Sequence, residues 1–189
     1  MTLLLLMRGS QKVLIGISAA AAGAALLGAS RLLGRHPVGN RRVPEPLKPV
    51  LLDRYLGRWY ELARYEQQFE RGCEAATADY ELRPDGKIAV LNRCRKSNGT
   101  IAEARGIAKI VDPQTNAKLK VSFFGPFYGS YWILDHAEDY AWSIVGEPSG
   151  RYLWILARNP RPDNRQIEEL TKRASELGYD TSMLVFDNQ

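Results

Sequence analysis

The feature that most constrains the fold of this chain is a succession of short β-strand patterns between residues 57 and 158. Runs of β-forming residues recur there, separated by turn signals such as Pro84-Asp85-Gly86, whose glycine tolerates the positive φ of a tight hairpin. Residues 117–124 show the cleanest alternation of apolar and polar side chains. The pattern predicts eight strands, over residues 58–65, 75–82, 87–95, 104–111, 117–124, 130–135, 140–146 and 151–158.

One helix is expected after the strands. Asp163 is a suitable N-cap, because its carboxylate can accept a hydrogen bond from a first-turn N–H group. Apolar residues recur at helical spacing on one face, and Gly178 ends the pattern; they are Ile167, Leu170, Ala174 and Leu177. Residues 183–186 then predict a ninth short strand.

Consecutive antiparallel strands leave two unpaired edges unless the sheet closes on itself. We therefore predict an all-β fold, an eight-stranded antiparallel up-and-down barrel with one C-terminal helix. Such a barrel holds either a packed core or one small ligand. Small residues are expected on the inward faces, and they favour a cavity for a ligand over a packed core. These residues are Ala76, Ala78, Ala104 and Ala108. Charges at outward positions, such as Lys118 and Lys120, argue against a barrel embedded in lipid.

The formal charge of +5 belongs to the N-terminal segment. Residues 1–46 hold six basic groups and one acid, whereas residues 47–189 carry 20 groups of each sign. We therefore expect no nucleic-acid partner for the folded part. The two histidines, His36 and His136, cannot build a multi-histidine metal site, and the sequence contains no glycine-rich nucleotide motif, so no cofactor is expected.

An uncharged apolar stretch over residues 13–30 follows Arg8 and Lys12, as is typical of a signal peptide or an uncleaved signal anchor. We assign residues 1–30 to that element, 31–50 to a Pro-rich linker and 51–189 to the folded domain. The end of the stretch resembles a bacterial lipobox with Ser30 in place of the cysteine. Serine cannot form the thioether, so lipidation is not expected, and either cleavage at small residues or an uncleaved anchor remains open.

Several motifs follow one another along the predicted strands. Residues 53–61, which contain Gly57-Arg58-Trp59-Tyr60, residues 131–140 and residues 153–158 resemble the three signature regions of the lipocalin family. The sequences FERG at 69–72 and FFGPFYG at 123–129 are similar to those of bacterial outer-membrane lipocalins, relatives of apolipoprotein D. The resemblance runs from about residue 53 to 186. It implies a domain that holds fatty acids, lysophospholipids or similar amphipaths in its barrel.

Three residues of these motifs have a structural role that physics alone supports. Trp59 opens the first strand and is expected to plug the closed end of the barrel. Arg158 can lay its guanidinium group on the indole face, a contact worth roughly 0.5–2 kcal/mol. Gly57 allows a tight entry into the strand. We do not expect these residues to contact a ligand.

Aromatic and apolar residues supply the candidate ligand wall. They are Tyr65, Tyr80, Val90, Phe123, Phe127, Tyr128, Tyr131, Trp142 and Trp154. Ordinary barrel packing is the alternative role for each. Phe127 and Tyr128 are favoured, because they follow Gly125-Pro126 in a loop expected near the mouth, where self-association or membrane contact is the alternative. Arg64, Arg71 or Arg93 could bind a headgroup phosphate.

Cys73 and Cys94 flank the hairpin formed by the second and third strands. Export would place them in an oxidising space, which favours a disulfide between them. Cys94 shares the face of Val90, whereas the direction of Cys73, before its strand, is unclear. Free thiols therefore remain the alternative.

A lipid-binding, non-enzymatic protein of the bacterial cell envelope is the leading functional hypothesis, in the periplasm, at the outer membrane or tethered by its anchor. A fatty acid or lysophospholipid and the envelope membrane are the expected partners, and a homodimer is possible. A lipocalin-scaffold enzyme is the alternative, with Glu61 as the lone inward acid. A carrier of haem or of another small hydrophobic ligand is a further alternative, and haem is disfavoured because His136 lies in a turn.

Overall fold

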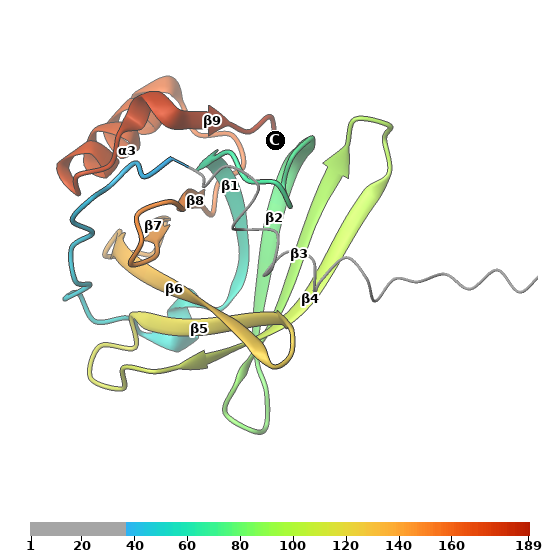
Figure 1. Cartoon of the computed structure of the whole chain (residues 1–189), viewed down its shortest axis with the longest axis vertical. Coiled ribbons are helices and arrows are strands. Elements are labelled where there is room, and N and C mark those ends of the chain that lie inside the picture. Colours follow the sequence, from blue (N-terminus) through green and yellow to red (C-terminus); the bar gives the residue numbers. More distant parts are fainter. Residues whose placement is uncertain (1–36) are drawn as a thin grey trace, which may run out of the picture. The chain divides into compact units, whose positions relative to one another are not determined.

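The computed structural model describes residues 37–189, which form a barrel with a helix on its outside (Figure 1). The expected signal peptide or anchor, including Ser30, lies outside the described residues. The strands are β1 (Gly57–Tyr65), β2 (Cys73–Leu82), β3 (Ile88–Lys96), β4 (Ile101–Ile110), β5 (Lys118–Phe124), β6 (Phe127–His136), β7 (Trp142–Gly146), β8 (Leu153–Ala157) and β9 (Leu184–Phe186). The helical elements are α2 (Leu52–Tyr55), α3 (Asn164–Glu176) and the 3₁₀ turn η2 (Thr181–Met183).

The strands pair in sequence order from β2 to β8, and β1 pairs with both β8 and β2. The second pairing closes the sheet, so the predicted eight-stranded antiparallel barrel is confirmed. The ninth strand, β9, pairs with the C-terminal part of β1, where Ala63 lies opposite Phe186. Within residues 37–189, no helix has the length and apolar character needed to cross a membrane.

The segment before α2 contacts the barrel, although its composition predicted a tether. Gly39 donates its N–H to the carbonyl of Gly150 at 3.0 Å. The Asn40 amide donates to the Leu177 carbonyl at 2.9 Å. Val50 is only 1% exposed and donates its N–H to Thr115 at 2.7 Å. Pairing with loops from distant parts of the chain satisfies the backbone here, which composition alone cannot reveal.

Two apolar clusters lie on opposite faces of the barrel wall. The inner cluster contains Trp59 and extends from β1 through β3 and β5 to β8. The outer cluster lies between the wall and α3, where Leu170 and Ala174 are buried. Asp163 caps α3 as predicted, because its side chain accepts the N–H of Gln166 at 2.8 Å. The amphipathic helix therefore covers one outer face of the barrel and leaves the interior free.

A disulfide joins Cys73 to Cys94, which confirms the expected bridge. The strand register explains how they share a face. On β2 and β3, Tyr80 lies opposite Val90, and Cys73 lies opposite Lys96. A bulge lies between these two pairs, between Glu74 and Thr77. The bulge adds one residue to β2 and reverses the alternation, so Cys73 turns to the face of Cys94.

Arg158 joins the closed end of the barrel to α2. Its guanidinium carbon lies 3.8 Å from the ring centroid of Trp59, which is fully buried. The same group donates to the carbonyls of Arg54, Tyr55 and Leu56 at 2.8–3.0 Å, and to that of Arg58. The expected stacking is thus present, and the hydrogen bonds to α2 add to it.

Replacement of Arg158 by Ala should lower the free energy of unfolding by about 2–4 kcal/mol, because carbonyls lose a charged donor and Trp59 loses its cover. Urea denaturation measures the change. Arg165→Ala is the control, since its exposed pair with Glu169 should contribute about 0.5 kcal/mol or less. Equal stability of the two variants would contradict a structural role for Arg158.

Loss of the disulfide should also destabilise the barrel. The double variant Cys73→Ala/Cys94→Ala should lose about 3 kcal/mol, because the bridge restricts a short loop in the unfolded chain. A reductant should destabilise the wild-type protein to the same extent and leave the double variant unchanged. An identical response of both proteins to reductant would show that the bridge does not constrain the chain in solution.

Candidate ligand-binding interior

The antiparallel order of the strands gives the barrel two different ends. Residues 66–72, 97–100, 125–126 and 147–152 connect strands at one end, which we call the open end. The other end, the closed end, carries α2 and Arg158. Inward-facing residues can therefore be ordered by their position along the barrel, from the closed end to the open end.

Inward-facing residues near the closed end are buried. Ile88, Val90, Leu119 and Ile133 are each at most 5% exposed and pack around Trp59. They form a floor. An aliphatic and aromatic floor of this kind excludes water and gives an acyl chain a surface to pack on.

Inward-facing residues above the floor remain accessible to solvent. Asn92 lies opposite Ala78 on β2 and Ala104 on β4, so all three face inward. Ala104 is nonetheless exposed, and Ala78 and Asn92 are partly exposed. Gly129, opposite Val121, is also exposed. Inward-facing small side chains above the packed floor therefore stay accessible to solvent, and we call this accessible part of the interior the cup.

Tyrosine hydroxyl groups form a hydrogen-bonded chain just above the floor. The Tyr131 hydroxyl lies 2.9 Å from that of Tyr80 and 3.0 Å from that of Tyr55, which lies 3.3 Å from Ser143 Oγ. Burial raises the pKa of Tyr55 to about 12 and those of Tyr80 and Tyr131 further. All three phenols therefore stay neutral at physiological pH, and their hydroxyl groups are hydrogen-bonded to one another and to Ser143.

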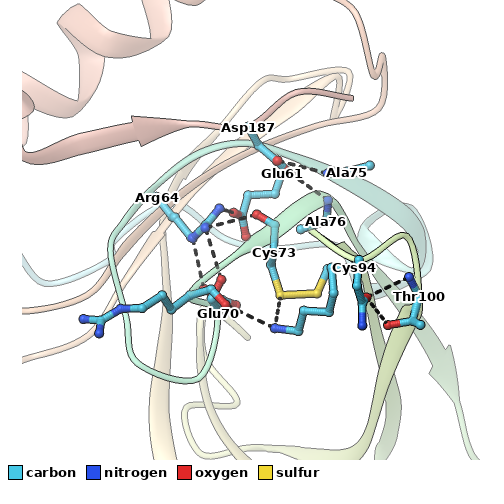
Figure 2. Close-up of a disulfide and its surroundings, with 12 residues drawn as sticks. Glu61, Arg64, Glu70, Cys73, Ala75, Ala76, Cys94, Thr100 and Asp187 are labelled. Carbon is cyan, nitrogen blue, oxygen red and sulfur yellow. Dashed lines mark hydrogen bonds and ion pairs between the residues drawn. A yellow bond between two sulfur atoms is a disulfide. The ribbon is translucent and has the colours of Figure 1, made fainter.

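A buried ionic cluster stands on the inner wall nearer the open end (Figure 2). Arg64 Nη1 donates to Glu61 Oε1 at 2.8 Å, and both side chains are at most 7% exposed. Arg64 Nε lies 3.7 Å from Glu70 Oε2, which also accepts the Trp154 indole N–H at 3.3 Å. Two carboxyl groups thus share one guanidinium group in a site that excludes most water.

The C-terminal tail seals the wall beside this cluster. The β1–β2 ladder ends at Tyr60 and Thr77, beyond which β2 bulges away. Asp187 fills the gap, because its carboxylate accepts the N–H groups of Ala75 and Ala76 at 3.0 and 2.6 Å (Figure 2). Gln189 donates to the Glu61 and Ala76 carbonyls. The tail therefore substitutes for the missing ladder.

The structure brings five of the predicted wall residues to the interior, and four lie elsewhere. Tyr80, Val90, Phe123, Tyr131 and Trp154 belong to the inner cluster or pack against it. Tyr65 and Trp142 pack in the outer cluster beside α3, and Tyr65 donates to the Asp180 carbonyl at 3.0 Å. The bulge between Glu61 and Ala63 turns Tyr65 away from the face of Trp59, and strand alternation alone could not show that Trp142 would lie on the face covered by α3.

Phe127 and Tyr128 were expected in a loop, but they form the start of β6, directly after the Gly125-Pro126 turn. Tyr128 faces outward, where Lys109 Nζ lies 4.5 Å from its ring centroid. Phe127 lies opposite Phe124 at the hairpin tip and is 58% exposed. Both residues belong to the rim of the cup, and neither is part of its inner wall.

Glu61, Arg64, Glu70 and Asn92 are interior residues that sequence reasoning did not assemble. The sequence predicted Glu61 as a lone inward acid and Arg64 as a candidate for binding a headgroup phosphate, but it did not predict that the two pair. The two are three residues apart and would face opposite sides of a regular strand. A register shift between Glu61 and Ala63 turns them to the same side.

Aromatic rings lead from the rim into the cup. The ring centroids of Phe69 and Tyr152 are 6.5 Å apart, and those of Tyr152 and Trp154 are 6.0 Å apart, both stacked. Phe69 is 63% exposed in the β1–β2 loop. This series gives an apolar ligand a continuous aromatic surface from solvent to the inner wall.

Two further hollows lie outside the barrel. One of about 830 Å³ lies between α3 and the β6–β7 turn, where Arg173 already pairs with Asp135 at 2.6 Å. Another of about 700 Å³ runs over β2–β5, and many of its lining residues, such as Asp79 and Arg105, face outward. His136 is buried with both ring nitrogens against carbonyl oxygens. Among the described residues, no cluster of acids, histidines and cysteines suits a metal ion.

Known proteins share this sequence pattern and architecture. Residues 50–189 match the family model of the Lipocalin-like domain. Outer membrane lipoprotein Blc of Vibrio cholerae is 43% identical over 152 residues, which cover 78% of this chain and 89% of the relative. The protein of the same name from Escherichia coli K12 is 41% identical over 137 residues, with coverages of 72% and 77%. Insecticyanin from Manduca sexta superposes with a TM-score of 0.63 at 23% identity, over 81% of this chain and 88% of that chain.

The ionic cluster predicts a pH dependence of stability. Burial and the neighbouring Glu70 raise the pKa of Glu61 from 4.5 to about 8. Between these values the folded protein retains a proton that the unfolded chain has released. The stability contributed by this group is therefore complete below pH 4.5 and is lost as the pH rises through 8.

We expect Glu61→Gln, which imitates the protonated acid and still accepts from Arg64, to lose less stability than the wild type between about pH 5 and pH 9. Urea unfolding at several pH values measures the difference. Glu81→Gln, at an exposed position of β2, should retain the wild-type profile. Parallel profiles for wild type and Glu61→Gln would show that Glu61 ionises as readily in the folded state as in the unfolded one.

Proposed function

This chain belongs to the lipocalin family, which confirms the resemblance read from its motifs, and from that membership we propose that it carries a fatty acid or lysophospholipid in its barrel. The family implies a small hydrophobic ligand. The observation that supports a ligand here is the cup itself, in which the inward-facing Ala104 is exposed above a packed floor.

The two ends of the cup suit the two ends of an amphipath. An acyl chain would pack between Val90, Phe123 and Trp154, gaining about 0.8 kcal/mol for each buried CH₂ group. The headgroup would lie higher, near Arg64, whose Nε atom is buried and has no hydrogen-bond partner among the described residues. Asn92 Oδ1 is likewise buried and unpartnered in that part of the chain, so it could accept a hydrogen bond from a ligand.

We place this activity in the cell envelope. The support comes from the relatives, which are outer membrane lipoproteins, and from the basic and apolar N-terminal sequence. The alternative of an enzyme gains no support from Glu61, because that carboxylate is engaged by Arg64 at 2.8 Å. Fractionation of cells that express the full chain tests the placement, and recovery in the cytoplasm would contradict it.

Acyl burial predicts a steep dependence of affinity on chain length. Titration of lysophosphatidylcholines or fatty acids, followed by tryptophan fluorescence, should show about a fourfold gain in affinity for each added CH₂ until the cup is full. A flat series, or no saturable change with either class, would contradict acyl burial. The class that binds more tightly identifies the preferred headgroup.

A matched pair of substitutions locates the ligand. Ala104→Phe should reduce affinity by about tenfold or more, because the added ring occupies the open part of the cup. Ala89→Phe makes the same chemical change on the outer face of the neighbouring strand, opposite Ile107, and should bind normally. Equal affinities of the two variants would place the ligand outside the barrel.

A further inference from the structure

Exposed aromatic side chains gather at the open end of the barrel. Phe124 and Phe127 lie opposite each other at the tip of the β5–β6 hairpin and are 70% and 58% exposed. Tyr128 follows at 40%, and Phe69 in the β1–β2 loop is 63% exposed. Ile101, which starts β4 at the same end, is 61% exposed. Exposed side chains of this size at loop tips mark an interaction site.

Positive charge is concentrated in the strands that carry this end. Residues 91–130 hold seven basic and two acidic groups, although residues 47–189 as a whole are neutral. The basic groups are Arg93, Arg95, Lys96, Arg105, Lys109, Lys118 and Lys120. Figure 1 shows the hairpins that bear them, β3–β4 and β5–β6, coloured from green to yellow. The rest of the domain therefore carries the balancing negative charge.

Two of the basic groups, Lys109 and Lys120, lie beside the aromatic tip. Arg93 and Arg95 pair with Asp79 and Glu74, and Lys118 pairs with Glu45 near the closed end. Lys109 Nζ lies 4.5 Å from the ring centroid of Tyr128, and Lys120 Nζ lies 3.0 Å from Ser130 Oγ on the next strand. Arg105 is 74% exposed, and its pairing with Glu103 is a surface contact. Apolar tips beside cations match the interface of an anionic bilayer, where rings enter the headgroup layer and cations meet phosphates.

We propose that the rim of the cup, defined as Phe69, Ile101, Phe124, Phe127 and Tyr128, docks on the surface of an anionic lipid bilayer. Lys96, Lys109, Lys120 and the exposed Arg105 supply the attraction, and the rings of the β5–β6 tip insert. The mouth then faces the lipid, and the series Phe69–Tyr152–Trp154 continues from the bilayer surface to the inner wall. Docking goes beyond the proposed cargo, because it requires neither an occupied cup nor a particular headgroup.

Amide hydrogen exchange of the full chain tests this docking. All variants carry the same N-terminal segment, so differences between them in exchange at residues 123–129 report on the rim. The protein is mixed with vesicles of phosphatidylglycerol and phosphatidylcholine, or of phosphatidylcholine alone. Residues 123–129 should exchange more slowly on the anionic vesicles only, and high salt should reduce the protection. The closed-end turn at residues 83–87 should exchange equally in both.

Two double variants complete the design. Phe124→Ser/Phe127→Ser should reduce the vesicle-induced protection by about tenfold, because two apolar side chains no longer leave water. Leu82→Ser/Val111→Ser removes comparably exposed apolar residues (52% and 47%) near the closed end and should leave the protection intact. Both should keep the chain-length dependence of lysolipid binding, so a failure of docking remains distinct from a failure of cargo binding.

Three results would overturn the proposal. The first is equal exchange of residues 123–129 with and without anionic vesicles. The second is protection that survives Phe124→Ser/Phe127→Ser. The third is protection without vesicles that grows with protein concentration, which would assign the rim to a second copy of this chain.

Discussion

The contact between Arg158 and Trp59 determines which end of the barrel is closed and which is open. One guanidinium group covers the indole and donates to carbonyls of α2 and β1, so it ties the end of β8 to the segment that enters β1. These strands come from opposite ends of the barrel sequence and pair side by side. Because this end is closed, the interior has a floor, and the loops at the open end surround the entrance to the barrel.

The open half of the barrel depends on a different kind of interaction. There β1 and β2 separate, and the wall is completed by a disulfide, a shared guanidinium group and the C-terminal tail. Buried ion pairs are weak evidence for stability, because desolvation offsets much of their attraction. Their placement beside the accessible part of the cup fits a polar region retained for a ligand, whereas the apolar floor accounts for the packing.

Much of the fold could be predicted because strand alternation and turn residues are local properties. The eight barrel strands, the ninth strand, the Asp163 cap and the stacking of Arg158 on Trp59 all follow from neighbours in sequence or from motif order. The candidate site was less predictable. Tyr65 and Trp142 were expected inside the barrel, but the β1 bulge turns Tyr65 outward, and Trp142 lies on the outer face that α3 covers. No local pattern states which side of a closed sheet a helix will occupy.

The sequence by itself determined the order of strands, the closure into a barrel, the lipocalin family and the distribution of charge, because each is written in periodicity, motif order or composition. Only the tertiary structure decided which side chains meet. Bulges reverse the alternation beside Cys73 and between Glu61 and Ala63, bringing Cys94 to Cys73 and Arg64 to Glu61. A bulge inserts one extra residue and so reverses the alternation beyond it, and in β2 the carboxylate of Asp187 accepts the N–H groups that the ladder leaves free.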